Sequence, residues 1–336
     1  MQQFIRERGR ALRPSSNTRN LQQIPSGSTY GKLIKGCFTA PPGWLMVGAD
    51  FASLEDRINA LLTKDPNKLK CYTDGYDGHA LRAYYYWPEA FPDLKETPED
   101  INSIKKQDHP LRQASKTPTF ALTYAGTWQT LVKNSGFSPE EAKRIEANYH
   151  ALYRVSDEWT QARIDQAARD GYAEAAFGLR IRCPLLHQSL MGHRTTPRES
   201  EAEARSLGNA LSGQSYGLLN NRAANAFMEK VWASPFRYDI LPIALIHDAI
   251  YLLIRDGVEV VKFVNDHLIE EMSWQALPEI QHPEVKLGAE LDVFYKNWAQ
   301  PITLPNHATR REIIQIAEEG AEAYDLVTHM DKGKAA

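Results

Sequence analysis

The segment that most restricts the possible folds is residues 240–255, ILPIALIHDAIYLLIR, where His247 and Asp248 stand side by side in an almost wholly apolar run. Such a run predicts two buried strands joined by a tight turn at the His-Asp pair. A buried carboxylate is costly unless something pairs with it. Asp248 therefore needs a partner, which is either structural, such as an Arg or a cap, or a metal ion.

The composition allows a sizeable core. The chain has 336 residues, of which 43% are hydrophobic and 10% aromatic, enough for one large domain or two smaller ones and against disorder. The net charge of −3 hides an asymmetry, because basic residues gather in the first 35 positions and acidic residues near the C-terminus. This asymmetry indicates either a basic binding face with an acidic appendage or ordinary solvated surface.

Cysteine usage and hydropathy indicate a cytoplasmic protein. The three cysteines, Cys37, Cys71 and Cys183, are far apart and form no C-x-x-C pair, which argues against a zinc ribbon or a disulfide framework. The start, MQQFIRERGR, lacks the apolar region of a signal peptide. No stretch approaches 18 uninterrupted apolar residues, so no membrane span or membrane partner is expected.

Periodicity, caps and turn residues predict the order of elements. Helices are expected at 53–63, 77–87, 111–126, 138–171, 199–233, 258–273 and 306–336. Strands are expected at 43–51, in 240–255 and in 285–298, with a hairpin about Gly178, whereas 1–30 and 88–110 predict surface loops. This mixed order favours an α+β sheet with a helical insertion between about 60 and 170.

Three signals refine the predicted helices. Pro118 is expected to kink the helix at 111–126 or restrict its first turn. Gly213 or Gly217 is expected to interrupt the helix at 199–233. Ser138 forms a predicted capping box with the Glu three residues on, and Gly171 is a plausible terminator.

Two acids each follow an apolar strand. Asp50 follows WLMVGA and Asp248 follows IALIH, nearly 200 residues later. Carboxylate oxygens are the ligands that Mg²⁺ prefers, and two ions roughly 4 Å apart can activate a hydroxyl and stabilise a leaving pyrophosphate. Two unrelated acids in turns or caps would give the same pattern, and these residues alone leave both interpretations open.

The segment RQASKTPTFALTYAG places Arg112, Lys116, Phe120 and Tyr124 at steps of four. On a helix, side chains at this spacing share one face. Cations suit a triphosphate, and an aromatic ring suits stacking on a base. An amphipathic helix with solvated basic residues is the alternative, but it does not explain why both kinds of residue share the stripe.

Here the sequence resembles the family A DNA polymerases, the group that includes bacterial repair polymerases and phage replicases. VGADFASLEDR resembles the first palm motif, RQASKTPTFALTYAG the fingers helix with its R-x3-K-x3-[F/Y]-x3-Y-G pattern, and IHDAI the second palm motif, usually His-Asp-Glu. RPSSNTRNLQQIP, DGHALRA, EARSLGNALSGQSYG and FYKNW also resemble family segments. The motifs run in the family's order from about residue 10 to 298.

The resemblance implies a role for each matched residue. Asp50 and Asp248 would hold two Mg²⁺ ions, for which Mn²⁺ can substitute, and Lys116 would act with them in catalysis. The expected nucleotide-binding residues are Arg112, Lys116, Phe120, Tyr124, His79 and Glu55, of which Glu55 screens the sugar 2′ side. The expected DNA-binding residues are Arg13, Arg205, Asn209, Gln214 and His247.

The resemblance also implies a polymerase right hand, with an antiparallel palm sheet and a helical fingers insertion but without its own thumb. Residues 1–60 would form the first part of the palm with a pre-palm DNA-binding segment, and 61–170 the fingers. Residues 171–298 would complete the palm. Residues 299–336 would be an acidic helical extension, which either docks a partner or is a solvated tail.

We therefore expect the palm-fingers subunit or fragment of a template-directed DNA polymerase, adding dNTPs to a primer 3′-OH on primer-template DNA in phage-like replication. If phage-encoded, it would work in the bacterial host cytoplasm. The family's thumb and 3′–5′ exonuclease lie upstream of the Arg13 segment, so a separate polypeptide is expected to supply them. A chain shortened from a longer polymerase would look the same.

The sequence departs from the family pattern at three places. Ala249 replaces the usual Glu, so one outer carboxylate near the metals is absent, although activity is still expected. Ala125 displaces a Gly, which would alter the fingers hinge, and one extra residue precedes Gln214. Phe120 implies discrimination against dideoxynucleotides.

Two other functions stay open. A single-subunit RNA polymerase shares the palm carboxylates, although Glu55 and NLQQIP argue for DNA. An inactive DNA-binding or scaffolding subunit would fit Ala249, although the presence of Asp50, Lys116 and Asp248 opposes it.

Overall fold

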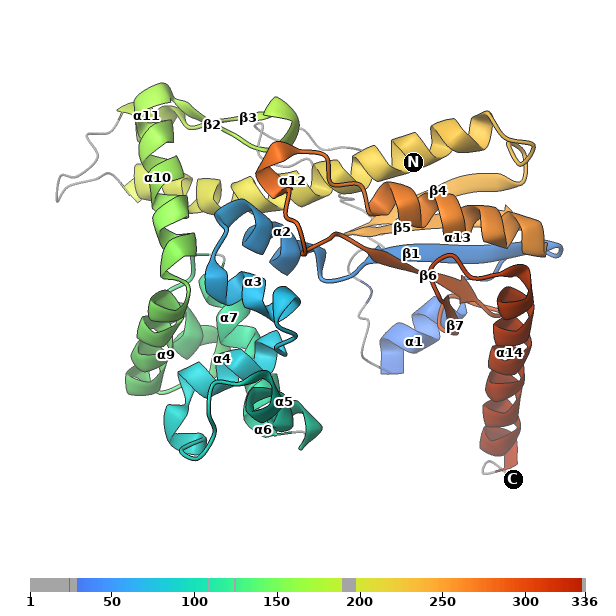
Figure 1. Ribbon diagram of the computed structural model, residues 1–336, viewed down its shortest axis with the longest axis horizontal. Helices are drawn as coiled ribbons and strands as arrows, with labels where there is room; N and C mark the ends of the chain where they lie inside the picture. The colour runs from blue at the N-terminus through green and yellow to red at the C-terminus, as the bar shows by residue number, and fades with distance from the viewer. Residues whose placement is uncertain (1–23, 25–28, 108, 124, 189–197, 334–336) are drawn as a thin grey trace. The chain divides into compact units, whose positions relative to one another are not determined.

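The computed structural model describes residues 24, 29–107, 109–123, 125–188 and 198–333 (Figure 1). The predictions at Arg13 and Tyr124, and most of the loop expected at 1–30, lie outside these residues. The chain forms two compact units. The sheet unit comprises Met1–Leu54, Tyr216–Gln275 and Leu287–Ala336, and the helical unit comprises Glu55–Ser215 and Ala276–Lys286.

An antiparallel sheet of five strands, in the order β4-β5-β1-β6-β7, forms the centre of the sheet unit. The strands are β1 (Trp44–Phe51), β4 (Ile240–Ile246), β5 (Ala249–Arg255), β6 (Ala289–Phe294) and β7 (Pro301–Leu304). The predicted strands and the strand-turn-strand around His247 and Asp248 are therefore confirmed, as is the α+β class.

The two faces of this sheet differ. Successive side chains of a strand point to opposite faces, so the fully buried Val47 and Ala49 lie on one face of β1, and Gly48 and Asp50 on the other. Helix α13 (Val258–Met272) contacts β1, β5 and β6 and covers the first face (Figure 1). The second face carries the candidate site described below.

Gly48 permits tight packing on that second face. Tyr251 of β5 is its cross-strand partner, and a Cβ at position 48 would lie 2.8 Å from the Tyr251 ring. Phe294 of β6 approaches the same point at 3.1 Å. A glycine is required here because two aromatic rings meet over the backbone of the central strand.

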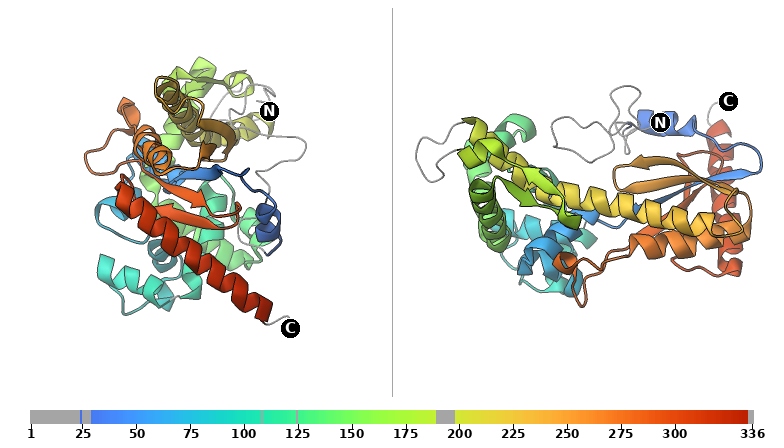
Figure 2. Two further views of the ribbon diagram at one scale, coloured as in Figure 1. Left: turned by 90° about the vertical axis from the view of Figure 1, so that its right-hand side faces the viewer. Right: turned by 90° about the horizontal axis from the view of Figure 1, so that it is seen from above.

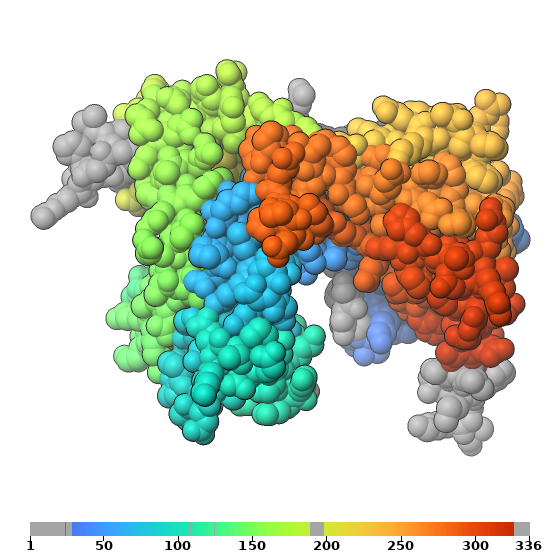
Figure 3. Space-filling model, in the orientation of Figure 1, coloured from blue at the N-terminus to red at the C-terminus, as the bar shows by residue number. Residues whose placement is uncertain are grey.

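The sheet unit also contains α1 (Thr29–Gly36) and α14 (Arg310–Gly333). Helix α14 packs on β7 and α13 (Figure 2). Its Gly320 lies so close to β7 that an added Cβ would be 2.8 Å from Ile302. In the space-filling view α13 and α14 form one continuous surface (Figure 3). The expected C-terminal helix is confirmed, although it begins at Arg310 rather than at 306.

The helical unit builds its own core from short helices. Its elements are α2 (Leu54–Thr63), α3 (Pro66–Thr73), α4 (Gly78–Tyr86), η2 (Pro88–Ala90), α5 (Pro98–Lys106), α6 (Pro110–Ala114), α7 (Lys116–Thr123), α8 (Trp128–Ser135), α9 (Pro139–Leu152), α10 (Arg154–Asp170), β2 (Tyr172–Glu174), η3 (Ala176–Gly178), β3 (Arg180–Arg182), α11 (Pro184–Gln188) and η4 (Pro278–Ile280). The helix α12 (Arg198–Trp232) contributes residues to both units. The hairpin about Gly178 is confirmed as β2 and β3.

The prediction of a surface loop at 88–110 was wrong for its second half. Helix α5 forms there, capped by Thr97, whose hydroxyl accepts a hydrogen bond from the Asp100 N–H. Ile101 and Ile104 are almost fully buried in the core of the helical unit. Ile101 and Ile104 are three residues apart and form a short apolar stripe on α5. The many charged residues around them made this stripe hard to recognise in the sequence.

The segment 111–126 is broken as Pro118 suggested. Helix α6 ends at Ala114 and α7 starts at Lys116. Pro118 lacks the N–H that would bond to the carbonyl of Ala114, four residues back, so the ladder is interrupted at that point. Beyond α7, Ala125 adopts a φ of 56°, a left-handed conformation that a glycine adopts at lower cost.

The helix expected at 138–171 is two helices. The Ser138 side chain accepts from the Glu141 N–H, which is one half of the predicted capping box, whereas the Glu141 carboxylate accepts from the Trp87 indole N–H. Gly171 ends the segment with a φ of 77°, as predicted. The break falls at Tyr153, which is fully buried. Asp65 then accepts a hydrogen bond of 2.9 Å from the Ser156 N–H, a cap that is 91 residues distant in sequence.

The interruption predicted near Gly213 or Gly217 was wrong, because α12 is continuous over 35 residues. A glycine inside a helix costs about 1 kcal/mol relative to alanine. Burial of Leu211, Leu219 and Phe227 on this helix outweighs that cost. Among the described residues, no helix is both long and apolar enough to span a membrane.

Candidate active site in the sheet unit

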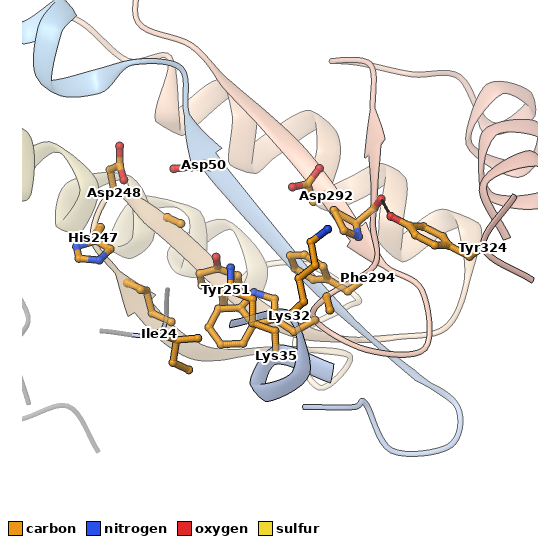
Figure 4. A pocket seen from close by; sticks show the side chains of 15 residues that line it. Ile24, Lys32, Lys35, Asp50, His247, Asp248, Tyr251, Asp292, Phe294 and Tyr324 are labelled. Atoms are coloured by element: carbon orange, nitrogen blue, oxygen red, sulfur yellow. Dashed lines mark hydrogen bonds between the residues drawn. The ribbon is translucent and has the colours of Figure 1, made fainter. Parts of the chain in front are cut away.

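A cavity of about 570 Å³ opens on the second face of the sheet (Figure 4). It is lined by residues of α1, β1, the β4–β5 hairpin, β6 and the chain after it: Ile24, Lys32, Lys35, Asp50, Ile246, His247, Asp248, Ala249, Tyr251, Asp292, Phe294, Trp298, Ala299, Pro301 and Tyr324. The cavity therefore combines carboxylates, two lysines and an aromatic floor.

The strand register brings the two predicted acids together. Asp50 pairs with Ala249 across β1 and β5, so Asp248 lies at the turn immediately beyond it. Figure 4 shows Asp50 between Asp248 and Asp292, as the strand order β5-β1-β6 requires. The expectation that Asp50 and Asp248 converge agrees with this geometry, whereas their role as metal ligands stays a prediction.

The proximity of these carboxylates changes the acidity of Asp50. Desolvation by the pocket walls, repulsion from Asp248, a hydrogen bond to Asp248 and repulsion from Asp292 raise the pKa of Asp50 to about 7. Asp50 is still partly in contact with solvent. Its carboxylate is therefore desolvated by the protein atoms around it without being fully enclosed. Crowded carboxylates of this kind favour a cation between them.

The donor set fits Mg²⁺. Among the residues that the structure describes, no three His, Cys, Asp or Glu side chains are arranged to surround one ion. Mg²⁺ sites that also bind phosphate use one or two carboxylates and leave the other positions to water and substrate oxygens. Asp50 and Asp248 fit that arrangement, with both carboxylates reaching the cavity from adjacent strands.

The turn that carries Asp248 is fixed by its own backbone conformation and by a hydrogen bond from α12. His247 adopts a φ of 55°, a left-handed conformation in which His is enriched among the non-glycine residues. Asn220 of α12, only 1% exposed, donates to the His247 carbonyl at 3.4 Å. Sequence reasoning missed Asn220, because nothing in the helix pattern distinguishes it from the neighbouring Asn221.

Aromatic rings form the floor of the cavity. Tyr251 stacks on Phe294 with a centroid distance of 6.0 Å and meets Trp298 edge-on at 5.3 Å. Burial raises the pKa of Tyr251 to about 12, so the phenol is neutral at pH 7. The Lys35 ammonium lies 5.0 Å from the Trp298 ring centroid, and Lys32 shares its helix face.

Asp292, Lys32 and Lys35 were not predicted as site residues. Asp292 occurs in the strand AELDVF, where Glu290 and Asp292 alternate with apolar residues as on the solvent side of an ordinary strand and carry no local signal of function. The two lysines occur in a short helix with a mixed pattern. Only the tertiary structure shows that these side chains share a cavity with Asp50.

Several predicted nucleotide-binding residues lie in the helical unit. Arg112 binds Asp77 through two hydrogen bonds of 2.9 and 2.7 Å, so its planar fork holds the start of α4. Burial opposes ionisation of Asp77, but the Arg112 and Ala80 hydrogen bonds outweigh it and lower the pKa of that carboxyl. Lys116 and the 63% exposed Phe120 are four residues apart on α7 and share a face.

His79 is neutral at pH 7. Burial, together with repulsion from Arg82 and Lys116, lowers the pKa of His79 to about 4. A phosphate contact from this ring would therefore be a hydrogen bond rather than a charge pair. Glu55, the predicted sugar-screening residue, lies in the first turn of α2 and is half-buried.

The three predicted DNA-contacting residues of α12 do not share one face. Arg205 is exposed and Asn209 half-buried four residues on, whereas Gln214 is only 7% exposed. Because α12 continues without a bulge, Gln214, five residues after Asn209, is rotated by about 140° from Asn209 around the helix. Gln214 is therefore packed in the protein, and its DNA contact stays a prediction.

Comparisons with known proteins agree with this geometry. The sequence matches DNA polymerase family A over residues 2–300. It is 28% identical over 274 residues to DNA polymerase I of Synechocystis sp., covering 80% of this chain and 25% of that protein. It is 27% identical over 246 residues to DNA polymerase I of Pseudomonas aeruginosa, covering 73% and 25%.

A third relative, the thermostable DNA polymerase I of Thermus thermophilus, is 29% identical over 175 residues, 52% of this chain and 20% of that protein. The chain thus spans a fifth to a quarter of the length of these relatives. Among solved structures, the POL domain of Pol1 from M. smegmatis, in complex with DNA primer-template and dNTP, superposes with a TM-score of 0.68. That match has 23% sequence identity and covers 85% of this chain and 46% of the other, which shows a shared fold.

Proposed function

The chain belongs to DNA polymerase family A, and from that premise we propose that it is the palm-fingers part of a template-directed DNA polymerase. Its substrates are dNTPs and the 3′-OH of a primer on primer-template DNA. The observation that supports this most strongly is the convergence of Asp50 and Asp248 in one cavity with Lys32 and Lys35. Two acids and two cations suit a reaction between a phosphate and a hydroxyl.

In this proposal Asp50 and Asp248 hold two Mg²⁺ ions, for which Mn²⁺ can substitute. When bound, such ions lower the pKa of a hydroxyl and neutralise charge on phosphate oxygens. The β4–β5 turn fixes Asp248, and Asn220 fixes the turn through the His247 carbonyl. His247 itself is exposed beside the cavity, where it can contact the primer end.

The helical unit supplies the nucleotide contacts in this proposal. Lys116 provides a point charge for the triphosphate and His79 a neutral hydrogen-bond donor. Phe120 offers an exposed ring to the base and sugar. Arg112 contacts the phosphates only if its guanidinium gives up at least one of its two hydrogen bonds to Asp77. Tyr124 completes the predicted nucleotide pocket.

The DNA contacts are assigned to Arg205 and Asn209 of α12 and to Arg13. Phosphate contacts of this kind position a duplex without reading its sequence. The two arginine contacts add to the affinity in a salt-dependent way.

Selection against ribonucleotides tests the assignment of Glu55. Replacing Glu55 by Ala removes the side chain that would clash with a ribose 2′-OH. The preference for dNTP over rNTP, measured as the ratio of kcat/KM values, is expected to fall at least about tenfold. Glu99→Ala, in the first turn of another helix of the same unit, is the matched control and should leave the ratio unchanged. A wild-type chain that prefers rNTPs would instead establish the RNA polymerase alternative.

We also propose that a separate polypeptide supplies a thumb and a 3′–5′ exonuclease, as in a phage-like replicase. Palm and fingers alone offer few phosphate contacts, so the chain is expected to extend a primer by only a few nucleotides per binding event at physiological salt. Processive extension by this chain alone, measured with a trap for dissociated enzyme, would contradict the proposal.

A further inference from the structure

On β5, the position opposite Asp50 carries no carboxylate. Ala249 is the cross-strand partner of Asp50 on β5, and its methyl group lines the cavity. On the other side of β1, the strand β6 places Glu290 opposite Asp50 and Asp292 opposite Gly48. Glu290 is exposed and does not line the cavity, whereas Asp292 does. Gly48 and Asp50 are two residues apart, so Asp292 lies on the same face of the sheet as Asp50 and diagonal to it.

This diagonal relation sets the distance at which Asp292 can act. Diagonal neighbours in an antiparallel pair are about 7–8 Å apart at the backbone. At that spacing Asp292 is too distant to share one ion directly with both other acids, in keeping with the lack of a three-ligand cluster in the described part of the chain. It is close enough to act through a water molecule or through its field.

Two further observations concern the position of the Asp292 carboxylate at this site. The Thr303 hydroxyl of β7 donates a hydrogen bond of 2.6 Å to Asp292 Oδ1, which orients the carboxylate across the cavity wall. Asp292 and Asp50 also line the same cavity from the adjacent strands β6 and β1. Figure 4 shows the Lys32 side chain between Asp292 and the aromatic floor.

We propose that Asp292 supplies the third carboxylate of the catalytic centre, on the opposite side of Asp50 from Ala249. It is a positioning residue, which strengthens cation binding at Asp50 and Asp248 without direct coordination. This inference rests on the proposed function, because it requires a divalent cation at those two acids. Outer groups around a metal commonly change its affinity by about 10–100-fold.

The test is direct Mn²⁺ binding to the full chain without nucleotide or DNA, measured by electron paramagnetic resonance of the free ion. Asp292→Asn keeps the size and the Thr303 hydrogen bond but removes the charge, and should weaken Mn²⁺ binding about tenfold. Asp292→Glu, which keeps the charge, should stay within about twofold of wild type. Asp256→Asn removes an equal charge just beyond the other end of β5, outside the cavity lining, and should have no effect.

Thr303→Val provides a second approach, because it keeps every charge and removes only the orienting hydrogen bond. It is expected to weaken Mn²⁺ binding severalfold. Wild-type affinity in both Asp292→Asn and Thr303→Val, or equal losses in Asp292→Asn and Asp292→Glu, would overturn the inference. Asp248→Asn should abolish the Mn²⁺ binding of the wild-type chain. If wild type binds no Mn²⁺, or if Asp248→Asn binds it as well as wild type does, the metal assignment of the proposed function fails instead.

Discussion

Replacing Asp248 by Asn is expected to reduce dNTP incorporation at least about a thousandfold, a loss of roughly 4 kcal/mol of transition-state stabilisation. The reason is geometric, because Asp248 is at the tip of a two-residue turn that holds it beside Asp50. Asparagine has the same shape but loses the charge that holds a cation. Single-turnover extension of a labelled primer measures the effect.

The control for this prediction is Asp256→Asn. Asp256 is an exposed acid just beyond the other end of β5, and it does not line the cavity. Its variant should extend the primer at the wild-type rate, and both variants should unfold at the wild-type temperature. Undiminished activity of Asp248→Asn would remove the metal assignment, and it would favour a different catalytic centre.

The second large effect concerns stability of the helical unit. Arg82 is only 5% exposed and donates to Asp56 at 2.8 Å and to the Tyr153 hydroxyl at 2.9 Å. Lys68, 3% exposed, is a second buried cation near Asp56. Asp56→Asn leaves both cations without this anion, although Asp65 still lies near Lys68.

Breaking a buried ion pair by removing one partner costs about 3–5 kcal/mol. The side chain of Asp56 keeps 38% of its surface in solvent, so the loss expected here is lower, at about 2–4 kcal/mol. Urea unfolding monitored by circular dichroism measures it. Glu158→Gln breaks the exposed Arg154–Glu158 pair of α10 and should change the free energy of unfolding by no more than about 0.5 kcal/mol. Equal effects of the two variants would contradict the buried network.

The same network implies a pH dependence. Burial lowers the pKa of Lys68 from 10.5 to about 8, with Asp56 opposing that shift. Between these values the unfolded chain binds a proton that the folded chain has released, so the contribution of Lys68 to stability increases as pH rises above about 8. Asp56→Asn removes the opposing charge, so the increase should begin at lower pH in that variant.

The strands were predictable because their signal is local. Residues 43–51 and 240–255 are uninterrupted apolar runs, which the interior of a sheet requires. The strand ends then indicated Asp50 and Asp248, and the register of β1 with β5 brings them together. What sequence could not supply was the neighbour on β6, because Asp292 becomes part of the site only through pairing across the sheet.

Helix boundaries were less predictable for a similar reason. The break at Tyr153 depends on burial against Arg82 and on a cap from Asp65, both distant in sequence. The continuity of α12 through Gly213 and Gly217 depends on apolar packing along its length. In contrast, the break before α7 follows from Pro118, a residue whose effect is local.

The central claim is template-directed synthesis at the Asp50–Asp248 centre, and single-nucleotide extension on four primer-templates tests it most directly. Each template presents a different next base, and each reaction contains the full chain, Mg²⁺ and one dNTP. The account predicts addition of only the complementary dNTP on each template, and no addition by Asp50→Asn or with excess chelator. Addition that ignores the template, or extension that survives in Asp50→Asn, would contradict it.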